Sequence, residues 1–349
     1  MAARADAAVY SLPDRPLVSV VTPCYNHEPF LGDYVAGLLA QTYDNVELVI
    51  FDDGSIDGSW QEIRAHAPAL ERKFRRVVVE RHANVGLVRE LDLALQRVTG
   101  DLLCILESDD YYLPEKLEEN VRFLRGNPDV GAVHSDTDYV HANRIEERHW
   151  RRTRERIPEG DVFEQLLRSN FVMTCAFCCR TPLVHEHVNL GAYIRRDYPA
   201  ADYPMFLDLA QHTPFGYIDR SLARYRVREG SLSHPTDPDV HFDYFRRHLR
   251  MRLDYANDER VSPEVAHLVK RDYYRFLYRR GLALGRPDDH GEGLRWLRDN
   301  HPGHYDGLRH VLGTYLVRMA PLWRLARRVG ALRAVWRAWL AVARRQPRA

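Results

Sequence analysis

The sequence predicts an α/β protein built on a mainly parallel sheet with helices on both faces. Over the first 140 residues, short continuous apolar runs alternate with segments whose apolar residues recur at helical spacing. Continuous apolar runs of this length are typical of parallel strands that are buried on both faces. From about residue 238 the chain changes to helical patterns rich in Arg, Tyr and Leu, which predict a helical C-terminal appendage.

Strands and helices are expected to alternate through this first part. The apolar runs place strands at residues 17–22, 46–51, 77–80, 102–106 and 130–134. Helical spacing falls between them, at residues 30–40, 59–66, 86–98 and 114–124, and Gly100 is expected to cap the third helix. The layout is Rossmann-like, but no Gly-x-Gly-x-x-Gly turn follows the first strand, which argues against a dinucleotide oxidoreductase.

Residues 144–234 carry a less regular pattern. Charge dominates residues 144–160 and predicts a surface loop or hairpin, with a phosphate-binding basic patch as the alternative. The segments that follow predict a helix at 161–168, a strand at 171–179, a helix at 202–211 and an extended stretch at 217–227. We therefore expect an N-terminal extension at residues 1–16, a main domain at 17–237 and a helical region at 238–349.

Net charge and cysteine content limit the classes of function that the chain can have. The formal net charge of +1 argues against a nucleic-acid binder, which usually carries a strong basic excess. The five cysteines form no disulfide framework, and we expect buried free thiols in a reducing cytoplasm. Cys175 and Cys178 have the spacing of a metal or redox pair but lack a second pair. We expect neither a secretory signal nor a transmembrane helix.

The last part of the chain is basic and amphipathic. Nine Arg and no Asp or Glu occur between Arg318 and Ala349, and Leu and Trp alternate with Arg over residues 311–342. Such helices suit an interface with anionic lipid, and they equally suit a helix pair packed on protein. A cytoplasmic protein and one attached peripherally to the inner face of the cell membrane are both compatible with this pattern.

Acidic residues gather where strands are expected to end. Residues 52–55 (Asp-Asp-Gly-Ser) follow the second strand, residues 107–110 (Glu-Ser-Asp-Asp) follow the fourth, and Asp202 opens a helix. Ligands of open α/β sheets bind beyond the carboxyl ends of the strands. Carboxylates gathered there do not all stay charged without a cation, so the clusters predict a divalent metal and a phosphate-bearing ligand.

Six segments within about residues 17–234 stand in a distinctive order and spacing. They are VSVVTPCYN at 18–26, DDGS at 52–55, NVG at 84–86, ESDD at 107–110, Asp202 at a helix start, and YRVREGSLS at 225–233. Each segment alone is weak evidence, but together they resemble the inverting, metal-dependent glycosyltransferases of family 2. The resemblance implies a GT-A fold and a nucleotide-sugar donor.

The resemblance also implies which residues hold the nucleotide base. Thr22, Pro23 and Tyr25 would line the pyrimidine ring, the alternative being a simple turn after the strand. Either Asp52 or Asp53 would accept the imide N–H of the base, and we favour Asp53. The alternative is that the pair only caps the following helix.

Basic and amide residues are expected near the donor diphosphate. Asn84 and Arg89 follow the third strand, and Arg89 either approaches the diphosphate or is a solvated helix residue. Arg228 stands where relatives commonly carry a His. A guanidinium does not bind a metal but can clamp phosphate through two hydrogen bonds. His234 lies nearby and is an alternative replacement for the missing His.

Residues 107–110 take the place of the Asp-x-Asp motif of the family. Asp109 is predicted to contact Mn²⁺ or Mg²⁺, with the phosphates of the donor supplying further oxygen ligands. Glu107 replaces the usual first Asp, and whether it contacts the metal or the ribose stays open. Ser108 and Asp110 are expected in the same nucleotide-sugar loop.

Asp202 is the predicted general base. Inversion needs a carboxylate on the far side of the anomeric carbon from the diphosphate, where it takes the proton of the acceptor hydroxyl. The family places this acid at the start of a helix, and its usual Glu-Asp pair is Ala201-Asp202 here. Asp197 is an alternative base, and an acid that only stabilises the helix dipole is the structural alternative.

The sequence thus predicts a metal-dependent hexosyltransferase. It would move a sugar from a nucleotide-sugar donor, with a UDP-sugar favoured, to a hydroxyl of a glycan or lipid-linked glycan. The family resemblance implies bacterial cell-surface polysaccharide synthesis. A nucleotidyltransferase is one alternative, but the Gly-rich basic loop that it needs after the first strand is absent. A non-catalytic glycan-binding or scaffold protein is the other, against which Asp109 and Asp202 count.

Overall fold

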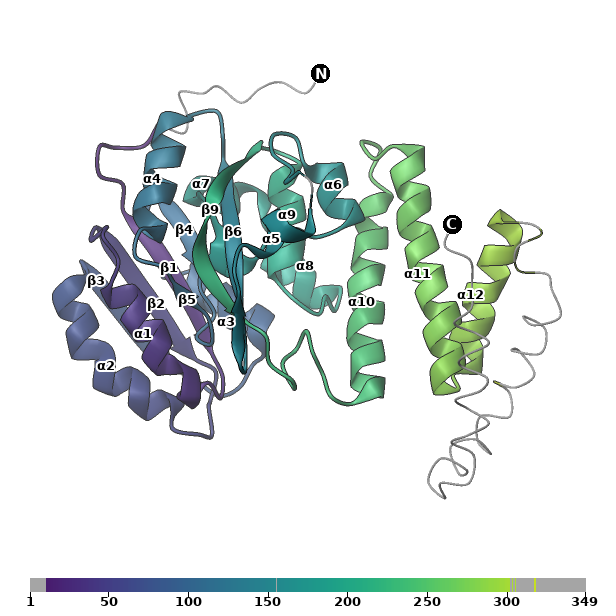
Figure 1. Ribbon diagram of the computed structural model, residues 1–349, viewed down its shortest axis with the longest axis horizontal. Helices are drawn as coiled ribbons and strands as arrows, with labels where there is room; N and C mark the ends of the chain where they lie inside the picture. Colours follow the sequence, from purple (N-terminus) through teal and green to yellow (C-terminus); the bar gives the residue numbers. More distant parts are fainter. Residues whose placement is uncertain (1–10, 155, 302, 304, 306–316, 318–349) are drawn as a thin grey trace. The chain divides into compact units, whose positions relative to one another are not determined.

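The computed structural model describes residues 11–154, 156–301, 303, 305 and 317. The chain forms two compact units, residues 1–234 and residues 235–349 (Figure 1). Within the described residues, no helix has both the length and the apolar character needed to cross a membrane. The amphipathic stretch predicted at residues 311–342 lies outside the described residues, apart from Val317.

A single sheet forms the centre of the first unit, with the strand order β3-β2-β1-β4-β8-β6-β9-β5 and β7 paired to β6. The first four strands in this order pair in parallel, as predicted. They are β3 (Arg76–Arg81), β2 (Val46–Asp52), β1 (Val18–Cys24) and β4 (Leu102–Ile105). Parallel strands end at the same edge, so the loops after β1, β2 and β4 meet there.

The other half of the sheet is mixed. The strand β8 (Phe177–Arg180) runs antiparallel to both β4 and β6 (Ala132–His141), whereas β9 (Phe215–Arg226) runs parallel to β6. The short strands β5 (Tyr111–Tyr112) and β7 (Arg144–Glu146) pair antiparallel with β9 and β6. This arrangement brings the end of β9, and the loop after it, to the residues that follow β4.

Helices cover both faces of the sheet, as predicted. One face packs against α1 (Leu31–Leu39), α2 (Ser59–Lys73) and α4 (Lys116–Gly126), whose apolar residues join those of β1, β2 and β4 in one core. The other face receives α3 (Leu87–Leu95), which contacts β1 and β2. Shorter helices complete the unit: α5 (His149–Thr153), α6 (Phe163–Arg168), α7 (Thr181–His187), α8 (Leu190–Arg195) and α9 (Asp202–Ala210). All five cysteines are free and buried, as predicted.

Two local predictions were wrong. The expected strand at 171–179 is instead the 3₁₀ turn η3 (Thr174–Ala176) followed by the shorter β8. The third helix ends at Leu95, so Gly100 is not its cap. The backbone N–H of Gly100 donates to the buried Glu47 carboxylate, and a Cβ at Gly100 would lie 2.7 Å from the carbonyl oxygen of Leu17. Close packing, not helix termination, requires a glycine there.

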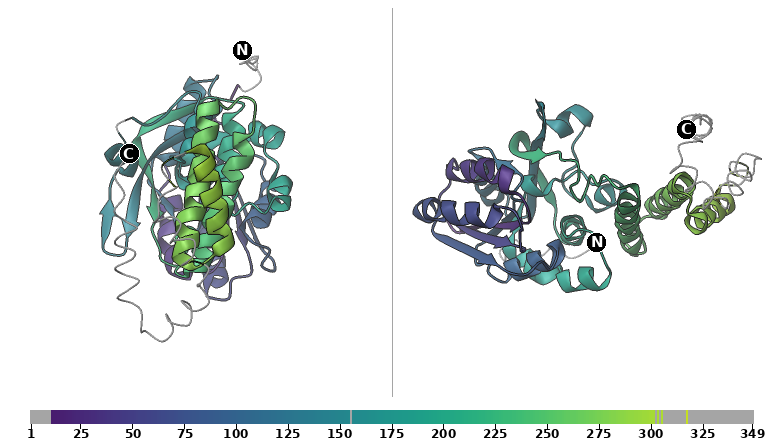
Figure 2. Two further views of the ribbon diagram at one scale, coloured as in Figure 1. Left: turned by 90° about the vertical axis from the view of Figure 1, so that its right-hand side faces the viewer. Right: turned by 90° about the horizontal axis from the view of Figure 1, so that it is seen from below.

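The second unit is helical where it is described, as its pattern predicted. It contains α10 (Pro238–Ala256), α11 (Pro263–Leu284) and α12 (Pro287–Asn300), and α11 packs against both other helices (Figure 2). Each helix begins with Pro, which suits the first turn because its missing N–H needs no partner there. Gly285 ends α11 in the left-handed conformation, with φ +68°.

Candidate active site

The loop after β1 is held by the segment after β2. The backbone N–H groups of Asn26, His27 and Glu28 donate to side-chain oxygens of Ser55, Ser59 and Asp57, over 2.8 to 3.1 Å. In return, the side chains of Asn26 and Glu28 accept the N–H groups of Ile56 and Gly58. This reciprocal pairing fixes the loop that carries His27 at the carboxyl edge of the sheet.

Asp52 and Asp53 are buried and bind protein groups. Asp52 Oδ2 lies 2.9 Å from Arg81 Nε, while Asp53 accepts the backbone N–H groups of Val85 at 2.7 Å and Gly86 at 2.9 Å, one on each oxygen. Asp53 therefore ties the loop before α3 to the end of β2. The same approach requires Gly54, which has φ +72°, because a Cβ there would lie 2.9 Å from Asn84 N.

The loop after β4 carries carboxyl groups with few partners. Glu107 Oε2 is buried without a hydrogen-bond partner in the structure. Burial, followed by the charges of Asp202 and Asp109, raises the pKa of Glu107 to about 8. Burial, then Asp109 and Glu107, also raises the pKa of Asp110 well above its usual range. These groups need protons or a cation to share the site.

Asp202 lies beside Glu107 at the start of α9. Its Oδ2 accepts the hydroxyl proton of Thr174 at 2.9 Å, and its charge is the second cause of the raised pKa of Glu107. Thr174 is in η3, directly before β8. The break in the strand that the sequence did not predict therefore places a hydroxyl on the predicted base.

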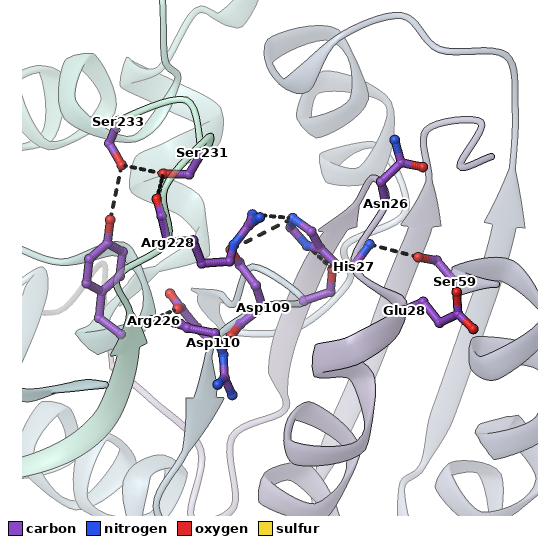
Figure 3. A network of polar contacts seen from close by, with 12 residues as sticks. Asn26, His27, Glu28, Ser59, Asp109, Asp110, Arg226, Arg228, Ser231 and Ser233 are labelled. Atoms are coloured by element: carbon purple, nitrogen blue, oxygen red, sulfur yellow. Dashed lines mark hydrogen bonds and ion pairs between the residues drawn. The ribbon is translucent and has the colours of Figure 1, made fainter. Parts of the chain in front are cut away.

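Arg228 reaches back to the loops after β4 and β1 (Figure 3). Its Nε and one terminal nitrogen both lie 2.8 Å from Asp109 Oδ2. The other contact of that terminal nitrogen is His27 Nε2, also at 2.8 Å. A guanidinium only donates, so Nε2 of His27 accepts and its Nδ1–H is left to donate to Ser108 Oγ at 2.8 Å. Burial is the main cause that lowers the pKa of His27, and a lowered pKa agrees with a neutral ring.

Arg226 fastens the end of β9 to the same loop. Its backbone N–H donates to Asp110 Oδ1 at 2.8 Å, and its guanidinium donates to the carbonyl oxygen of Asp109 and to Asp33. The guanidinium also lies 4.9 Å from the ring centre of Phe30. Residues 228–234 are closed by contacts of their own, such as Ser231 Oγ to the carbonyl oxygen of Arg228 (Figure 3).

The structure brings part of the predicted site together. Glu107, Ser108, Asp109, Asp110, Asp202 and Arg228 belong to one connected set. Thr22 is buried in β1 and accepts the Tyr34 hydroxyl, and Pro23 is also in β1, whereas Tyr25 is 43% exposed. Asn84 and Arg89 are exposed, the first beside the end of β2 and the second on α3, and no contact joins either to Asp109 among the described residues.

The sequence did not single out four residues of this region. They are His27, Thr174, Arg226 and Glu90. Glu90 is buried on α3, accepts the Cys24 N–H at 3.2 Å, and has its pKa raised to about 9, chiefly by burial. The apolar stripe of α3 offered a signal for Glu90, since an acid on a buried face is unusual. The other three follow from tertiary contacts that no spacing reveals.

The residues present fit a hard divalent cation only in part. Carboxylate oxygens are suitable ligands, and the unpartnered buried oxygen of Glu107 lies in the same loop as Asp109. In the part of the chain that the structure describes, no three His, Cys, Asp or Glu side chains are grouped so as to hold a metal by themselves. A cation there suits the donor set if the phosphates of a ligand supply further oxygens.

Residues 19–185 match the family model described as glycosyl transferase family 2. This part of the chain is a family 2 glycosyltransferase domain. An uncharacterized glycosyltransferase of Haemophilus influenzae is 23% identical over 228 residues, which cover 62% of this chain and 68% of that relative. TuaG of Bacillus subtilis, provisionally named a teichuronic acid biosynthesis glycosyltransferase, is 33% identical over 110 residues, which cover 32% of this chain and 42% of TuaG. The chain thus spans less than half of the length of TuaG.

Solved glycosyltransferases share the fold of this domain. S. aureus TarS 1-349 in complex with UDP-GlcNAc superposes with a TM-score of 0.54 at 16% identity, covering 81% of this chain and 80% of TarS 1-349. The mannosyltransferase PcManGT from Pyrobaculum calidifontis, in complex with GDP-Man and Mn²⁺, gives 0.53 at 18% identity, covering 95% and 88%. At these identities the likeness shows the fold alone, and it confirms the predicted GT-A glycosyltransferase architecture.

Proposed function

We propose that this glycosyltransferase domain transfers a hexose from a nucleotide-sugar donor to an acceptor hydroxyl with inversion of configuration. The observation that carries the proposal is that one site contains two groups of side chains with different hydrogen-bond partners. Asp202 and Thr174 form one group, beside Glu107, while Asp109 and Arg228 form the other. The first suits proton removal from an acceptor, and the second suits a charged diphosphate.

Asp202 is proposed as the general base. Its Oδ2 is already oriented by the Thr174 hydroxyl, which leaves Oδ1 for the proton of the incoming acceptor. General bases of this kind contribute about 10²- to 10⁴-fold to a rate. As the acceptor oxygen bonds to the anomeric carbon, the bond from that carbon to the diphosphate breaks, and the proton passes to Asp202.

Arg228 and Asp109 are proposed to hold the leaving group. The Arg228 guanidinium offers the paired N–H groups that bind phosphate oxygens well. A divalent cation bound by Asp109 and the phosphates would neutralise charge on the departing nucleoside diphosphate. Glu107 lies in the same loop as Asp109. Thr22, Pro23, Tyr25, Asp52, Asp53, Asn84, Arg89, Ser108 and Asp110 remain the proposed surroundings of the nucleotide and the sugar.

A UDP-sugar is the proposed donor, and a glycan or lipid-linked glycan the proposed acceptor. TarS binds UDP-GlcNAc, which supports the donor, and the provisional name of TuaG concerns teichuronic acid biosynthesis, which supports the acceptor. PcManGT binds GDP-Man and Mn²⁺, so GDP is the first donor nucleotide to compare. We propose residues 17–237 as the catalytic domain. It would act in the cytoplasm or at the inner face of the cell membrane, in bacterial polysaccharide synthesis.

Calorimetric titration of UDP and GDP, each with and without Mn²⁺, tests the proposal on the full chain. We expect UDP to bind with Mn²⁺ and the heat of binding to be lost in Asp109→Ala. UDP-sugars that then bind are assayed for transfer to glycan acceptors. If neither UDP nor GDP binds, dTDP is titrated next. Failure of all three nucleotides to bind under any metal would overturn the nucleotide-sugar assignment and favour a glycan-binding scaffold.

A further inference from the structure

Arg228 is paired with Asp109, the carboxylate to which the proposed metal would bind. Two of its nitrogens lie 2.8 Å from the same oxygen, Asp109 Oδ2. The side chains are only 24% and 14% exposed, so this is a shielded pair rather than a surface contact. Because arginine stays protonated at any physiological pH, its charge does not leave this oxygen unless the side chain moves.

Three loops position the guanidinium before any donor arrives (Figure 3). His27, from the loop after β1, accepts an N–H of Arg228 through Nε2. The ring of Phe30, in the short helix η2 (Glu28–Phe30), lies 5.1 Å from the guanidinium carbon. Asp109 comes from the loop after β4, and Arg228 itself follows β9. The position of Arg228 is thus specified by the fold and is not a chance contact of one long side chain.

A metal ion and this guanidinium are alternative partners for Asp109. A divalent cation on Oδ2 would stand within a few ångströms of a fixed positive charge, and the repulsion between like charges at that distance is strong in a partly buried site. A diphosphate changes the balance, because its oxygens accept the paired N–H groups of arginine and also ligate the metal. The two cations become compatible when the nucleotide is present.

We propose that Arg228 guards Asp109, so that divalent metal binds tightly only together with the nucleotide diphosphate. The inference rests on the proposed function and adds an order to it: Arg228 leaves Asp109 for the phosphates, and the freed carboxylate takes the metal. Coupling between two ligands is reciprocal, so nucleotide and metal each raise the affinity for the other by the same factor.

Mn²⁺ binding, measured by electron paramagnetic resonance of free Mn²⁺, tests the guard without any turnover. Titrations are made with and without UDP on the wild type, Arg228→Gln and Arg226→Gln. We expect Arg228→Gln to bind Mn²⁺ alone about tenfold more tightly than the wild type, the size expected for loss of a charge-assisted pair. The factor by which UDP raises Mn²⁺ affinity should fall by about the same amount.

Arg226→Gln is the matched control for loss of charge near the site. It removes a guanidinium that touches the backbone oxygen of Asp109 but not its carboxylate. We expect its Mn²⁺ affinity without UDP to stay within about threefold of the wild type. Arg228→Lys, which keeps the charge, should bind Mn²⁺ alone more weakly than Arg228→Gln. Arg228→Met also removes the charge and covers the case in which Arg228→Gln does not fold.

The outcomes separate this inference from the proposed function. Equal Mn²⁺ affinity of the wild type and Arg228→Gln without UDP, with UDP raising it in both, would overturn the guard and leave the transferase proposal standing. An equal gain in Arg226→Gln would reduce the effect to general charge and would also overturn the guard. Absence of Mn²⁺ binding from every protein, with UDP present, would remove the proposed function and the guard together.

Discussion

The ends of β2 and β4 carry similar acidic sequences but very different structures. After β2, Asp53 accepts two backbone N–H groups and Asp57 accepts those of Glu28 and Ser59. After β4, the only side-chain partners of Asp109 in the described residues are Arg228 and His27. A buried oxygen without a hydrogen-bond partner occurs in both clusters, at Asp52 and at Glu107. Asp53 and Asp57 are thus bound to backbone N–H groups, whereas Asp109 is bound to side chains.

This difference separates support from chemistry. A carboxylate that receives backbone N–H groups stabilises its loop and is costly to disturb. A carboxyl group that burial and like charges leave with a raised pKa, as at Glu107 and Asp110, is poised to bind a cation or a proton. We therefore propose that the end of β2 mainly supports the loops around the nucleotide, and that the end of β4 carries the chemistry of ligand binding.

The largest expected effect is on the rate of transfer. We expect Asp202→Asn to lower kcat by about 10³-fold, because it removes the proposed proton acceptor, while UDP affinity with Mn²⁺ stays unchanged. Steady-state assays and calorimetry measure the two quantities. Asp197→Asn is the control, since Asp197 is the other candidate base. Full activity in Asp202→Asn, together with loss in Asp197→Asn, would reverse the assignment.

A second prediction concerns how the unfolding free energy depends on pH through Glu90, which lies near Asp52 and Asp53 at the end of β2. The raised pKa of Glu90, about 9 against an ordinary 4.5, means that the folded state binds its proton more tightly than the unfolded state. The stability this provides is fully present below pH 4.5 and is lost as pH rises toward 9. Glu90→Gln removes the cost of protonation, so it should gain up to about 3 kcal/mol in unfolding free energy at pH 7 and much less at pH 5.

Urea unfolding at both pH values measures this gain. The exposed Glu71 on α2 supplies the control, since Glu71→Gln should change stability equally at the two values. A gain in Glu90→Gln that does not grow between pH 5 and pH 7 would contradict the assignment.

Asp53→Asn tests the supporting role of the β2 cluster. An amide oxygen can accept only one of the two N–H groups that the carboxylate now holds, and the acceptor loses its charge. We expect the unfolding free energy to fall by about 2 kcal/mol. Asp109→Asn should cost less than about 1 kcal/mol, because Arg228 keeps its contacts with His27 and Phe30 and an amide oxygen can still accept from it. Equal losses of unfolding free energy in the two variants, measured by urea unfolding, would contradict the different roles given to Asp53 and Asp109.

The smallest effect among the residues that hold the loops after β1 and β2 is expected at Ser59. Its hydroxyl accepts the His27 N–H at 2.8 Å and donates to Asp57 at 2.6 Å. Ser59→Ala should lower the unfolding free energy by about 1 kcal/mol and loosen the loop that carries His27. Faster amide hydrogen exchange at His27 would show the loosening. Unchanged exchange there would mean that the remaining contacts of the loop are sufficient.

The parallel half of the sheet and its covering helices could be predicted because each depends on local patterning. Runs such as residues 46–51 are apolar throughout, and a strand of that kind is stable only when both of its faces are covered. The second half could not be predicted in the same way. The break at η3 and the antiparallel strand β8 depend on how Thr174 to Arg180 pack between β4 and β6, which no local pattern encodes.

The sequence by itself determined the carboxylates at the carboxyl edge and the helix that begins at Asp202, because residue type and strand order are written in the chain. Only the tertiary structure decided which acids are free to act. Asp53 and Asp109 both follow parallel strands, yet one lies against backbone N–H groups and the other against Arg228, more than 100 residues away. Contacts between distant segments set the partner, the burial and the pKa of each group, and those quantities decide its chemistry.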